Sequence, residues 1–354
     1  MRQRALELGF GDCHFTTAAA PDSAESFQKW IAGKQHGEMV WLERNASKRI
    51  DPQRVLNGAR SVICLAASYE TSDKWLVTGD KKLPVPDSCH PSRVTRHGLI
   101  ARYARFDDYH EILGERLKAL AEFVNQFGNE TRSLWYVDTG PVLERDFAQR
   151  AGIGFVGKHT SLISRGLGNW ILLAEILTTL ELEPDAPEQN HCGKCTRCIT
   201  ACPTNAIIAP FKLDARKCIS YLTIELKGSI PVELRPAIGN RIYGCDDCLE
   251  VCPWNRFARE GKLMKPHARP DLTAPDLIEL LQVDEVGFKS RFAGTPILRT
   301  KRRGLLRNVC VALGNPGDVS ALPVLEAASR DSEPLIAEHA RWAMTHICHA
   351  SRQQ

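Results

Sequence analysis

The strongest constraint on this chain of 354 residues is a cysteine-rich segment between Cys192 and Pro253. Its first part, CGKCTRCITACP, has the spacing C-x2-C-x2-C-x3-C-P, and its second part, CDDCLEVCP, repeats the pattern with one cysteine fewer. The first spacing is typical of bacterial ferredoxins, in which the fourth cysteine binds the other [4Fe–4S] cluster of a pair. Cys218, alone between the two parts, supplies the eighth thiol that two clusters require.

The crossover of the fourth cysteine predicts which thiols share a cluster. Zinc sites or disulfides are the alternatives, but zinc favours two separated C-x2-C pairs. The pattern therefore predicts two [4Fe–4S] clusters, and we name their ligands set one and set two. Set one is Cys192, Cys195, Cys198 and Cys252, and set two is Cys202, Cys218, Cys245 and Cys248.

Composition sets broad limits on the remaining chain. The length is sufficient for two or three domains, and the net charge of +4 confines any nucleic-acid surface to a local patch. The first residues lack the apolar core of a signal peptide, and the most apolar stretch, residues 170–182, contains Glu175. We therefore expect a cytoplasmic protein without membrane spans. Its other cysteines should be buried small apolar residues: Cys13, Cys64, Cys89, Cys310 and Cys348.

Residues 1–183 show a mixture of helix and strand patterns, which predicts an α/β or α+β domain. Residues 74–98 are polar and aperiodic and indicate a long surface loop, and residues 184–190 resemble a linker to the cluster segment. The predicted helices are residues 1–12, 22–33 and about 110–127, and the predicted strands are residues 60–68, 133–138, 161–164 and 170–176.

Asp138 is the candidate for chemistry in this first domain. It ends a predicted strand just before a helix that we expect Thr139 to cap and Pro141 to open, running to about residue 150. Ligands of open α/β sheets bind at such strand ends. Asp138 could instead cap the helix, although Thr139 is better placed to do so.

A glycine-rich stretch at residues 152–160, GIGFVGKHT, satisfies G-x-G-x-x-G and nearly satisfies a P-loop. A dinucleotide fingerprint follows a strand and opens a helix, whereas this stretch follows a predicted helix. His159 also stands where a P-loop needs a hydroxyl. We expect the glycines to let the backbone approach some other large ligand.

The last segment, residues 271–354, predicts helices at residues 297–313, 319–329 and 333–347, with Asp318 capping the second. Such short antiparallel helices suggest a HEAT-like unit. The first helix is strongly basic, which indicates either a solvated face or a phosphate-binding patch that Arg256 could extend. The basic residues are Arg299, Lys301, Arg302, Arg303 and Arg307.

Several blocks together resemble the epoxyqueuosine reductase family. They are KRIDP, ARYARFDDYH, DTGPVLERDFAQRAGIGFVGKHTSLIS, GNWILLAEILTTLELEPD, HCGKCTRCITACPTNAI and YGCDDCLEVCPWN. The resemblance implies an α+β protein with an N-terminal cobalamin-binding domain (residues 1–183), a ferredoxin-like two-cluster domain (residues 184–270) and a HEAT-like helical domain (residues 271–354). It also implies reduction of the epoxide of epoxyqueuosine at the wobble position of tRNA.

The same resemblance implies roles for individual residues. Asp138 corresponds to the family's proton donor, and the basic helix near Arg303 would hold tRNA phosphates. His159 replaces an asparagine that the family usually has in GKNT. The implied cobalamin contacts are Arg49, Asp138, Gly154, Lys158, His159 and Thr160.

A family member would take electrons from a separate carrier, such as a flavodoxin or ferredoxin, and we expect it to be a monomer. Two alternatives share part of this pattern. A corrinoid reductive dehalogenase also combines cobalamin with two clusters, and a non-catalytic two-cluster electron carrier would need the cysteines alone.

Overall fold

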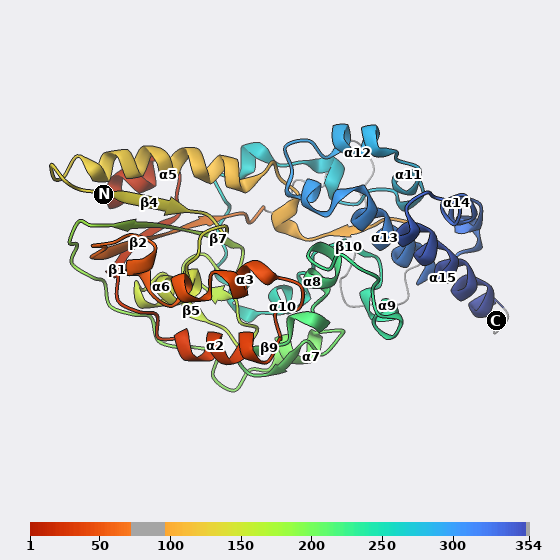
Figure 1. Ribbon diagram of the computed structural model, residues 1–354, viewed down its shortest axis with the longest axis horizontal. Helices are drawn as coiled ribbons and strands as arrows, with labels where there is room; N and C mark the ends of the chain where they lie inside the picture. Colours follow the sequence, from red (N-terminus) through yellow and green to blue (C-terminus); the bar gives the residue numbers. More distant parts are fainter. Residues whose placement is uncertain (72–95, 352–354) are drawn as a thin grey trace.

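The computed structural model describes residues 1–71 and 96–351 and is organised around a four-stranded antiparallel sheet (Figure 1). The strand order is β1-β2-β7-β4, so the long β2 and β7 form its centre. Because every pairing is antiparallel, the first domain is α+β, and the strand-end rule for parallel sheets does not apply to Asp138. The strands are β1 Asp12–Thr17, β2 Ser61–Ser68, β7 Ile171–Thr178 and β4 Ser133–Tyr136.

The strand β2 confirms the prediction for residues 60–68, and all of its residues are buried. Its side chains alternate between two cores. Ile63 and Leu65 pack under α5 (Tyr109–Asn125) on one face, while Val62 and Cys64 pack under α6 (Glu144–Arg150) on the other. Figure 1 shows these two helices on opposite sides of the sheet. The continuous apolar run therefore reflects burial on both faces.

The first strand, β1, was missed. Residues 1–12 were predicted as one helix, but the helix α1 ends at Glu7 (Arg2–Glu7), and the chain turns at Gly9, whose φ is +96°. The sequence DCHFTT alternates polar and apolar residues from Asp12 to Phe15, a strand signal that was overlooked, and the strand pairs with β2.

The predicted helix after Asp138 begins later than expected. Residues 137–143 form an irregular loop, and α6 starts at Glu144 with Leu143 at its N-cap position. Thr139 therefore does not cap a helix, and Asp138 adopts a left-handed backbone conformation with φ of +56°. The loop holds Asp138 in a conformation that costs a non-glycine residue free energy.

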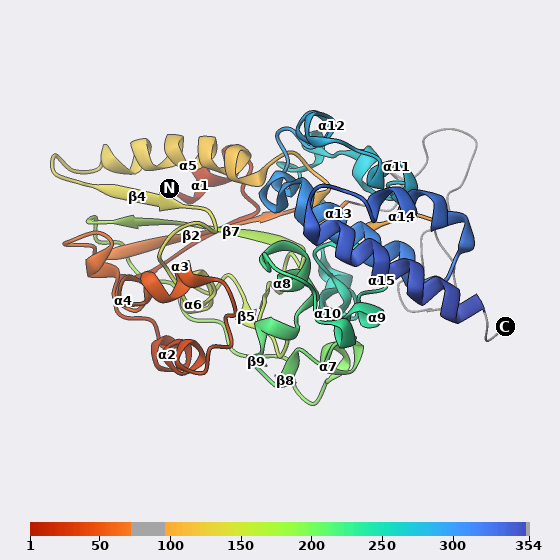
Figure 2. The same cartoon turned by 45° about the vertical axis from the view of Figure 1, so that its right-hand side comes forward.

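The cluster segment lies between the sheet domain and the C-terminal helices, with α7 near the lower edge of the view in Figure 2. One short strand pair joins it to the first domain, because β10 pairs in parallel with β3, whereas the other two short pairs each form within one segment. The short pairs are β3 Leu99–Ile100 with β10 Arg241–Tyr243, β5 Phe155–Val156 with β6 Leu162–Ile163, and β8 Ile207–Ala209 with β9 Lys212–Leu213. The remaining helices of the first two segments are α2 Ala24–Ala32, α3 Val40–Arg44, α4 Ala46–Arg49, α7 Arg197–Ala201, α8 Ile219–Ile224, α9 Arg235–Ile238 and α10 Asp247–Glu250.

The C-terminal segment is helical, as predicted, although its first helix is shorter than expected. A 3₁₀ turn at Pro296–Thr300 precedes α13, whose first residue, Lys301, has φ of +59°. Asp318 caps the next turn by accepting a hydrogen bond from the N–H of Ser320, as predicted. The helices are α11 Leu277–Leu281, α12 Glu285–Arg291, α13 Lys301–Gly314, α14 Leu322–Ala328 and α15 Pro334–Ser351.

These C-terminal helices do not have a core of their own. Leu305 and Ile336 belong to a buried cluster that also contains Ile100, Ile224 and Ile242 from the preceding segments. Packing therefore continues across the predicted boundary at residue 270, and the domain limits and the HEAT-like repeat stay predictions.

Most of the scattered cysteines are buried as predicted. Cys13, Cys64 and Cys310 are buried, but Cys348 is exposed, so the prediction for it is wrong. Cys89 and most of the predicted loop at residues 74–98 lie outside the described residues. No helix in the described part of the chain is both long enough and apolar enough to cross a membrane.

A buried arginine joins α13 to the cluster segment. The Arg307 side chain is 1% exposed and donates hydrogen bonds of 2.7–2.8 Å to the carbonyls of Leu222, Leu226 and Gly228. It also bonds Asn308, whose amide bonds the carbonyls of Thr223 and Ile242. Removing the guanidinium would leave buried carbonyls without donors.

We therefore expect Arg307→Met to lower stability by about 3 kcal/mol, because the lost bonds are charge-assisted and buried. Thermal unfolding followed by circular dichroism measures the effect as a midpoint several degrees lower. Arg303→Met, one helical turn away and exposed, is the matched control and should unfold like the wild type. Equal midpoints for both variants would contradict the anchoring role.

Candidate functional site

The eight cysteines of the cluster segment gather in two groups. After burial, the nearby thiols of Cys192, Cys252 and Cys195 raise the pKa of Cys198. After burial, the thiols of Cys218 and Cys202, then the Asp246 carboxylate and the Cys198 thiol, raise the pKa of Cys248, which in turn neighbours Cys245. Cys198 of set one thus also lies near Cys248 of set two, and the assignment of thiols to each cluster stays a prediction.

One backbone contact in the second group suits a cluster thiolate. The backbone N–H of Ala206 donates to Cys202 Sγ at 3.2 Å, an interaction that tunes cluster thiolates.

Lys158 links the cluster segment to the first domain. Its Nζ donates to the carbonyls of Gly193 and Cys195, both at 2.8 Å. The side chain therefore holds the loop of set one, which is the role that its contacts show.

The Asp138 loop is the centre of the second group of candidate residues. The carboxylate is 54% exposed and accepts a hydrogen bond from the hydroxyl of Tyr109 at 2.9 Å. His110 Nε2 lies 3.9 Å from the same oxygen, and its Nδ1 faces Asp108 at 2.7 Å. Two residues at the start of α5 thus orient an accessible carboxylate.

Two further carboxyl groups lie beneath this loop. Glu175 on β7 is opposite Cys64 and Tyr136, so it faces α6, and neither of its oxygens has a hydrogen-bond partner among the described residues. Burial, and then the charges of Glu144 and Asp138, raises the pKa of Glu175 well above its ordinary value. Burial, and then Asp138, raises the pKa of Glu144 to about 8. Both groups are therefore protonated near neutral pH.

Arg49, a predicted cofactor contact, lies in the same region. It is 8% exposed and donates from Nη1 to the carbonyl of Val142 at 2.9 Å. Burial lowers its pKa, while the charges of Glu144 and Asp138 oppose this effect, which shows that the three groups are neighbours. Arg49 Nε and His110 Nε2 are buried and lack a hydrogen-bond partner in the described part of the chain. Such unpartnered groups suit a ligand with a polar rim.

The predicted reason for the glycines at 154 and 157 is not the one that the structure gives. A Cβ on Gly154 would lie 2.2 Å from the carbonyl oxygen of Ile163, and one on Gly157 would lie 2.6 Å from the Ile163 side chain. The two glycines therefore allow β5 and β6 to pack closely. His159 is 4% exposed, and burial lowers its pKa to about 4, so the ring is neutral. The carbonyl of Thr160, whose φ is +71°, accepts a hydrogen bond from Arg145.

The basic residues predicted to bind nucleic acid have different environments. Arg307 is buried, so the prediction that it contacts tRNA is wrong. Arg302 pairs with Asp331 at 2.6 Å, and Arg299 pairs with Glu225 at 2.7 Å. Lys301 and Arg303 are exposed and form no ion pair with a described carboxylate. The acidic residues that pair with these arginines, Glu225 and Asp331, come from other elements of the fold. The sequence of the basic stretch alone does not reveal them.

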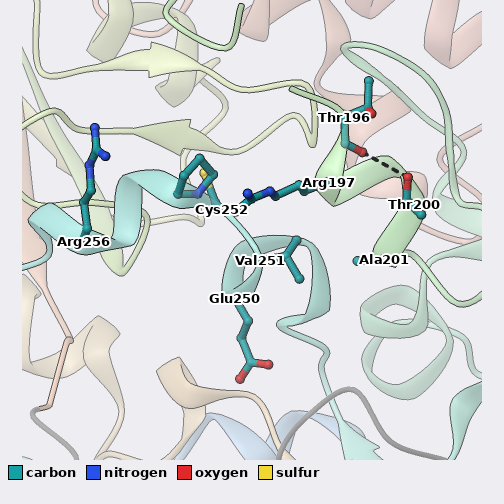
Figure 3. Close-up of a pocket in the computed structure, with 9 residues that line it drawn as sticks. Thr196, Arg197, Thr200, Ala201, Glu250, Val251, Cys252 and Arg256 are labelled. Atoms are coloured by element: carbon teal, nitrogen blue, oxygen red, sulfur yellow. Dashed lines mark hydrogen bonds between the residues drawn. The ribbon is translucent and has the colours of Figure 1, made fainter. Parts of the chain in front are cut away.

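Arg256, which was expected to extend that patch, lines a separate groove of about 700 Å³ (Figure 3). The groove lies between α7, α10 and the turn Pro253–Phe257, and it contains Cys252 of set one. This surface therefore belongs to the cluster segment.

Sequence reasoning missed Tyr109, His110, Glu144 and Glu175 as members of the site. Glu175 did carry a signal, because it is an acidic residue inside the apolar run of residues 170–182. Glu144 carried none, since a glutamate in the first turn of a helix is ordinary.

Comparison with known proteins identifies the class. The family model for a "4Fe-4S double cluster binding domain" matches residues 191–255, and the model "Epoxyqueuosine reductase QueG, DUF1730" matches residues 49–139. An epoxyqueuosine reductase from Xanthomonas campestris pv. campestris is 41% identical over 348 residues, which cover 97% of this chain and 94% of the relative. The Escherichia coli (strain K12) epoxyqueuosine reductase is 40% identical over 345 residues, which cover 97% and 88%.

Solved structures of epoxyqueuosine reductases also match this chain over almost its full length. A crystal structure of epoxyqueuosine reductase with a tRNA-Tyr epoxyqueuosine-modified tRNA stem loop matches with a TM-score of 0.84 and 33% identity over 98% of this chain and 88% of that one. A Bacillus subtilis epoxyqueuosine reductase, with an aspartate-bearing catalytic loop swung out of the active site, matches with a TM-score of 0.84 and 32% identity over the same shares.

The double-cluster segment and its matches define the protein first as an iron–sulfur oxidoreductase. The full-length relatives then specify the group more closely. The chain belongs to the epoxyqueuosine reductase family. This membership sets aside the non-catalytic electron carrier, and the full-length likeness favours epoxyqueuosine reductases over reductive dehalogenases.

Loss of one ligand should affect one cluster. We expect Cys218→Ala to reduce the iron content from about eight to about four atoms per chain, because each [4Fe–4S] cluster needs four protein thiolates. Iron analysis after anaerobic reconstitution measures this change. Cys348→Ala removes an exposed thiol outside both sets and should retain all the iron. Unchanged iron in Cys218→Ala would remove Cys218 from set two.

The raised pKa of Glu144 predicts a dependence of stability on pH. The unfolded chain loses this proton near pH 4.3, whereas the folded protein keeps it until about pH 8. Between these values the unfolded state binds fewer protons, so stability falls as pH rises.

Glu144→Gln, which imitates the protonated acid, should therefore gain several degrees in midpoint relative to wild type between pH 5 and pH 8. Thermal unfolding at a series of pH values tests this. Glu115→Gln, on the exposed face of α5, should follow the wild-type profile. Parallel profiles for Glu144→Gln and wild type would show that Glu144 ionises normally.

Proposed function

We propose that this protein reduces the epoxide of epoxyqueuosine to the alkene of queuosine at the wobble position of tRNA. The observation that carries this proposal is the full-length similarity to epoxyqueuosine reductases, one of which has been crystallised with an epoxyqueuosine-modified stem loop. The reaction consumes two electrons and two protons and releases water. The protein must therefore deliver electrons and protons to the same carbon–oxygen unit.

The cysteines would hold the electron-transfer groups. Set one and set two each supply the four thiolates that one [4Fe–4S] cluster requires, and two clusters can pass electrons inward one at a time. The donor outside the protein would be a flavodoxin or ferredoxin. We expect the protein to act as a cytoplasmic monomer.

The unpartnered groups around Asp138 suit cobalamin, whose corrin ring is rimmed with amides. Arg49 and His110 present buried nitrogens that have no hydrogen-bond partner among residues 1–71 and 96–351, and the hairpin with Gly154, Lys158, His159 and Thr160 would form an adjoining wall. Cobalamin, when bound, would supply a strongly nucleophilic cobalt centre for attack on a carbon of the strained epoxide ring.

Asp138 would donate the proton that the epoxide oxygen needs as its bond to carbon breaks. Its carboxyl group is accessible, and Tyr109 orients the Oδ2 atom. Without such a donor, negative charge would build up on the departing oxygen. The neighbouring Glu144, protonated at neutral pH, would return a proton to Asp138 for the second transfer.

The tRNA would approach from the side of α13. Burial lowers the pKa of Arg299, while Glu225 and then Asp138 raise it, so Arg299 lies near Asp138 and this basic surface borders the catalytic loop. Lys301 and Arg303 could bind phosphates of the tRNA backbone. Such contacts position the tRNA but do not recognise its base sequence. Arg299 and Arg302, which are paired with Glu225 and Asp331, would add positive charge to the same surface.

The proton-donor role predicts that Asp138→Asn lowers the rate of queuosine formation at least about 100-fold, as expected for loss of a general acid. The assay is anaerobic turnover of tRNA carrying epoxyqueuosine by protein loaded with clusters and cobalamin, with nucleosides identified by mass spectrometry. Asp22→Asn, at an exposed turn position outside the site, is the matched control and should keep the wild-type rate.

Three outcomes are distinct. Product from wild type and little from Asp138→Asn supports both the reaction and the donor. Equal product from both keeps the reaction and removes Asp138 from its role. No product from fully loaded, reducible wild type overturns the proposed reaction.

A further inference from the structure

The groove beside Cys252 has no role in the chemistry proposed for Asp138. It is an open surface feature of about 700 Å³ that separates α7 from α10 and the turn after Cys252. Figure 3 shows the side chain of Arg197 extending along the groove toward Cys252. A predicted ligand of the set-one cluster thus forms part of the groove wall.

The rim of the groove is positively charged. Arg197 and Arg256 line it and are exposed, and the exposed Lys194 lies in the same cysteine loop. None of the three forms an ion pair with a carboxylate in the part of the chain that the structure describes. Glu250 is the one acid among the lining residues, and its carboxylate lies 3.8 Å from Arg102. Net positive charge therefore faces solvent beside set one.

The thiols of set two are placed differently. Cys218 and Cys245 pack against a buried core that includes Leu222, Ile238 and Val311 from α13. Set two therefore lies toward the interior, under the C-terminal helices.

Aromatic rings continue from set two toward the catalytic loop. Tyr243, two residues before Cys245, has its ring 6.3 Å from that of Tyr103, and Tyr103 lies 6.0 Å from Tyr109. Tyr109 bonds Asp138. Set two thus faces the catalytic loop, whereas set one faces the groove.

We propose that the groove is the docking surface for a small acidic one-electron carrier protein, which reduces the set-one cluster first. The inference rests on the proposed function, because it assumes that both clusters are loaded. In each encounter the carrier loses one electron and the set-one cluster gains it, with no bond made or broken. The set-two cysteines would hold the second cluster, which would supply the next electron-transfer site toward the cobalamin proposed beside Asp138.

Charge explains why a carrier protein suits this surface. Electron-transfer complexes are small and transient, and opposite charge on the two partners raises their association rate. The tRNA is the other polyanion in the reaction, but its modified base must reach Asp138, which borders the separate basic surface of Arg299 and Arg303. Two basic surfaces thus match two anionic partners.

The test reverses the charge of the rim in cluster-loaded protein. Reduced flavodoxin is mixed anaerobically with wild type or with Arg197→Glu/Arg256→Glu, and cluster reduction is followed by stopped-flow absorbance without cobalamin or tRNA. We expect the rate at low salt to fall at least tenfold in the variant. The wild-type rate should fall as salt rises, and the variant should lose that dependence.

Two controls isolate docking. Arg116→Glu/Lys118→Glu makes the same change of charge on α5 and should keep the wild-type rate. Dithionite, which needs no docking surface, should reduce all variants equally. If the double reversal prevents cluster loading, Arg197→Gln/Arg256→Gln replaces it and should show a smaller loss of rate with a shallower salt dependence.

Equal reduction of wild type and rim variants by flavodoxin would overturn the proposal. So would unchanged reduction together with weaker binding of a tRNA stem loop, which would make the groove a nucleic-acid surface. Because reduction is measured without turnover, a failure of the queuosine reaction would not affect this result, and the two proposals fail separately.

Discussion

Exclusion of water from the sheet face beneath α6 is the constraint on which the site depends. Glu175 is fully buried there, and its oxygens have no hydrogen-bond partner among the described residues. The neutral, protonated carboxyl is therefore lower in free energy than the charged carboxylate. The same desolvation acts on Glu144, and the negative charge of Asp138 adds to it. Asp138, at the exposed end of this group, is the member that solvent or a substrate can reach. Burial thus distinguishes the three carboxyl groups: Glu175 and Glu144 have raised pKa values, and Asp138 is exposed.

The sequence predicted elements whose signal is local. The apolar run that became β2, the amphipathic pattern of α5 and the capping role of Asp318 depend on neighbours in the chain, and all three are confirmed. The cysteine spacing also predicted two [4Fe–4S] clusters, in agreement with the match to a double-cluster binding domain, because ligand geometry restricts the spacing.

Other features depend on partners far away in the sequence and could not be predicted from it. The loop around Asp138, for example, displaces the expected helix start. Arg307 looked like one member of a basic face, yet it satisfies carbonyls more than seventy residues away. Residue type alone does not distinguish an arginine that binds phosphate from one that donates hydrogen bonds to buried backbone carbonyls.

The bonds of Arg307 have a consequence for the order of assembly. The carbonyls that it holds, from Leu222 to Gly228, lie between Cys218 and Cys245, so the loop that separates two thiols of set two is fixed by a helix made later during synthesis. A growing chain that has just exposed Cys252 therefore lacks the helix that holds this binding loop. The loop between Cys218 and Cys245 can take its final shape only after α13 has been synthesised.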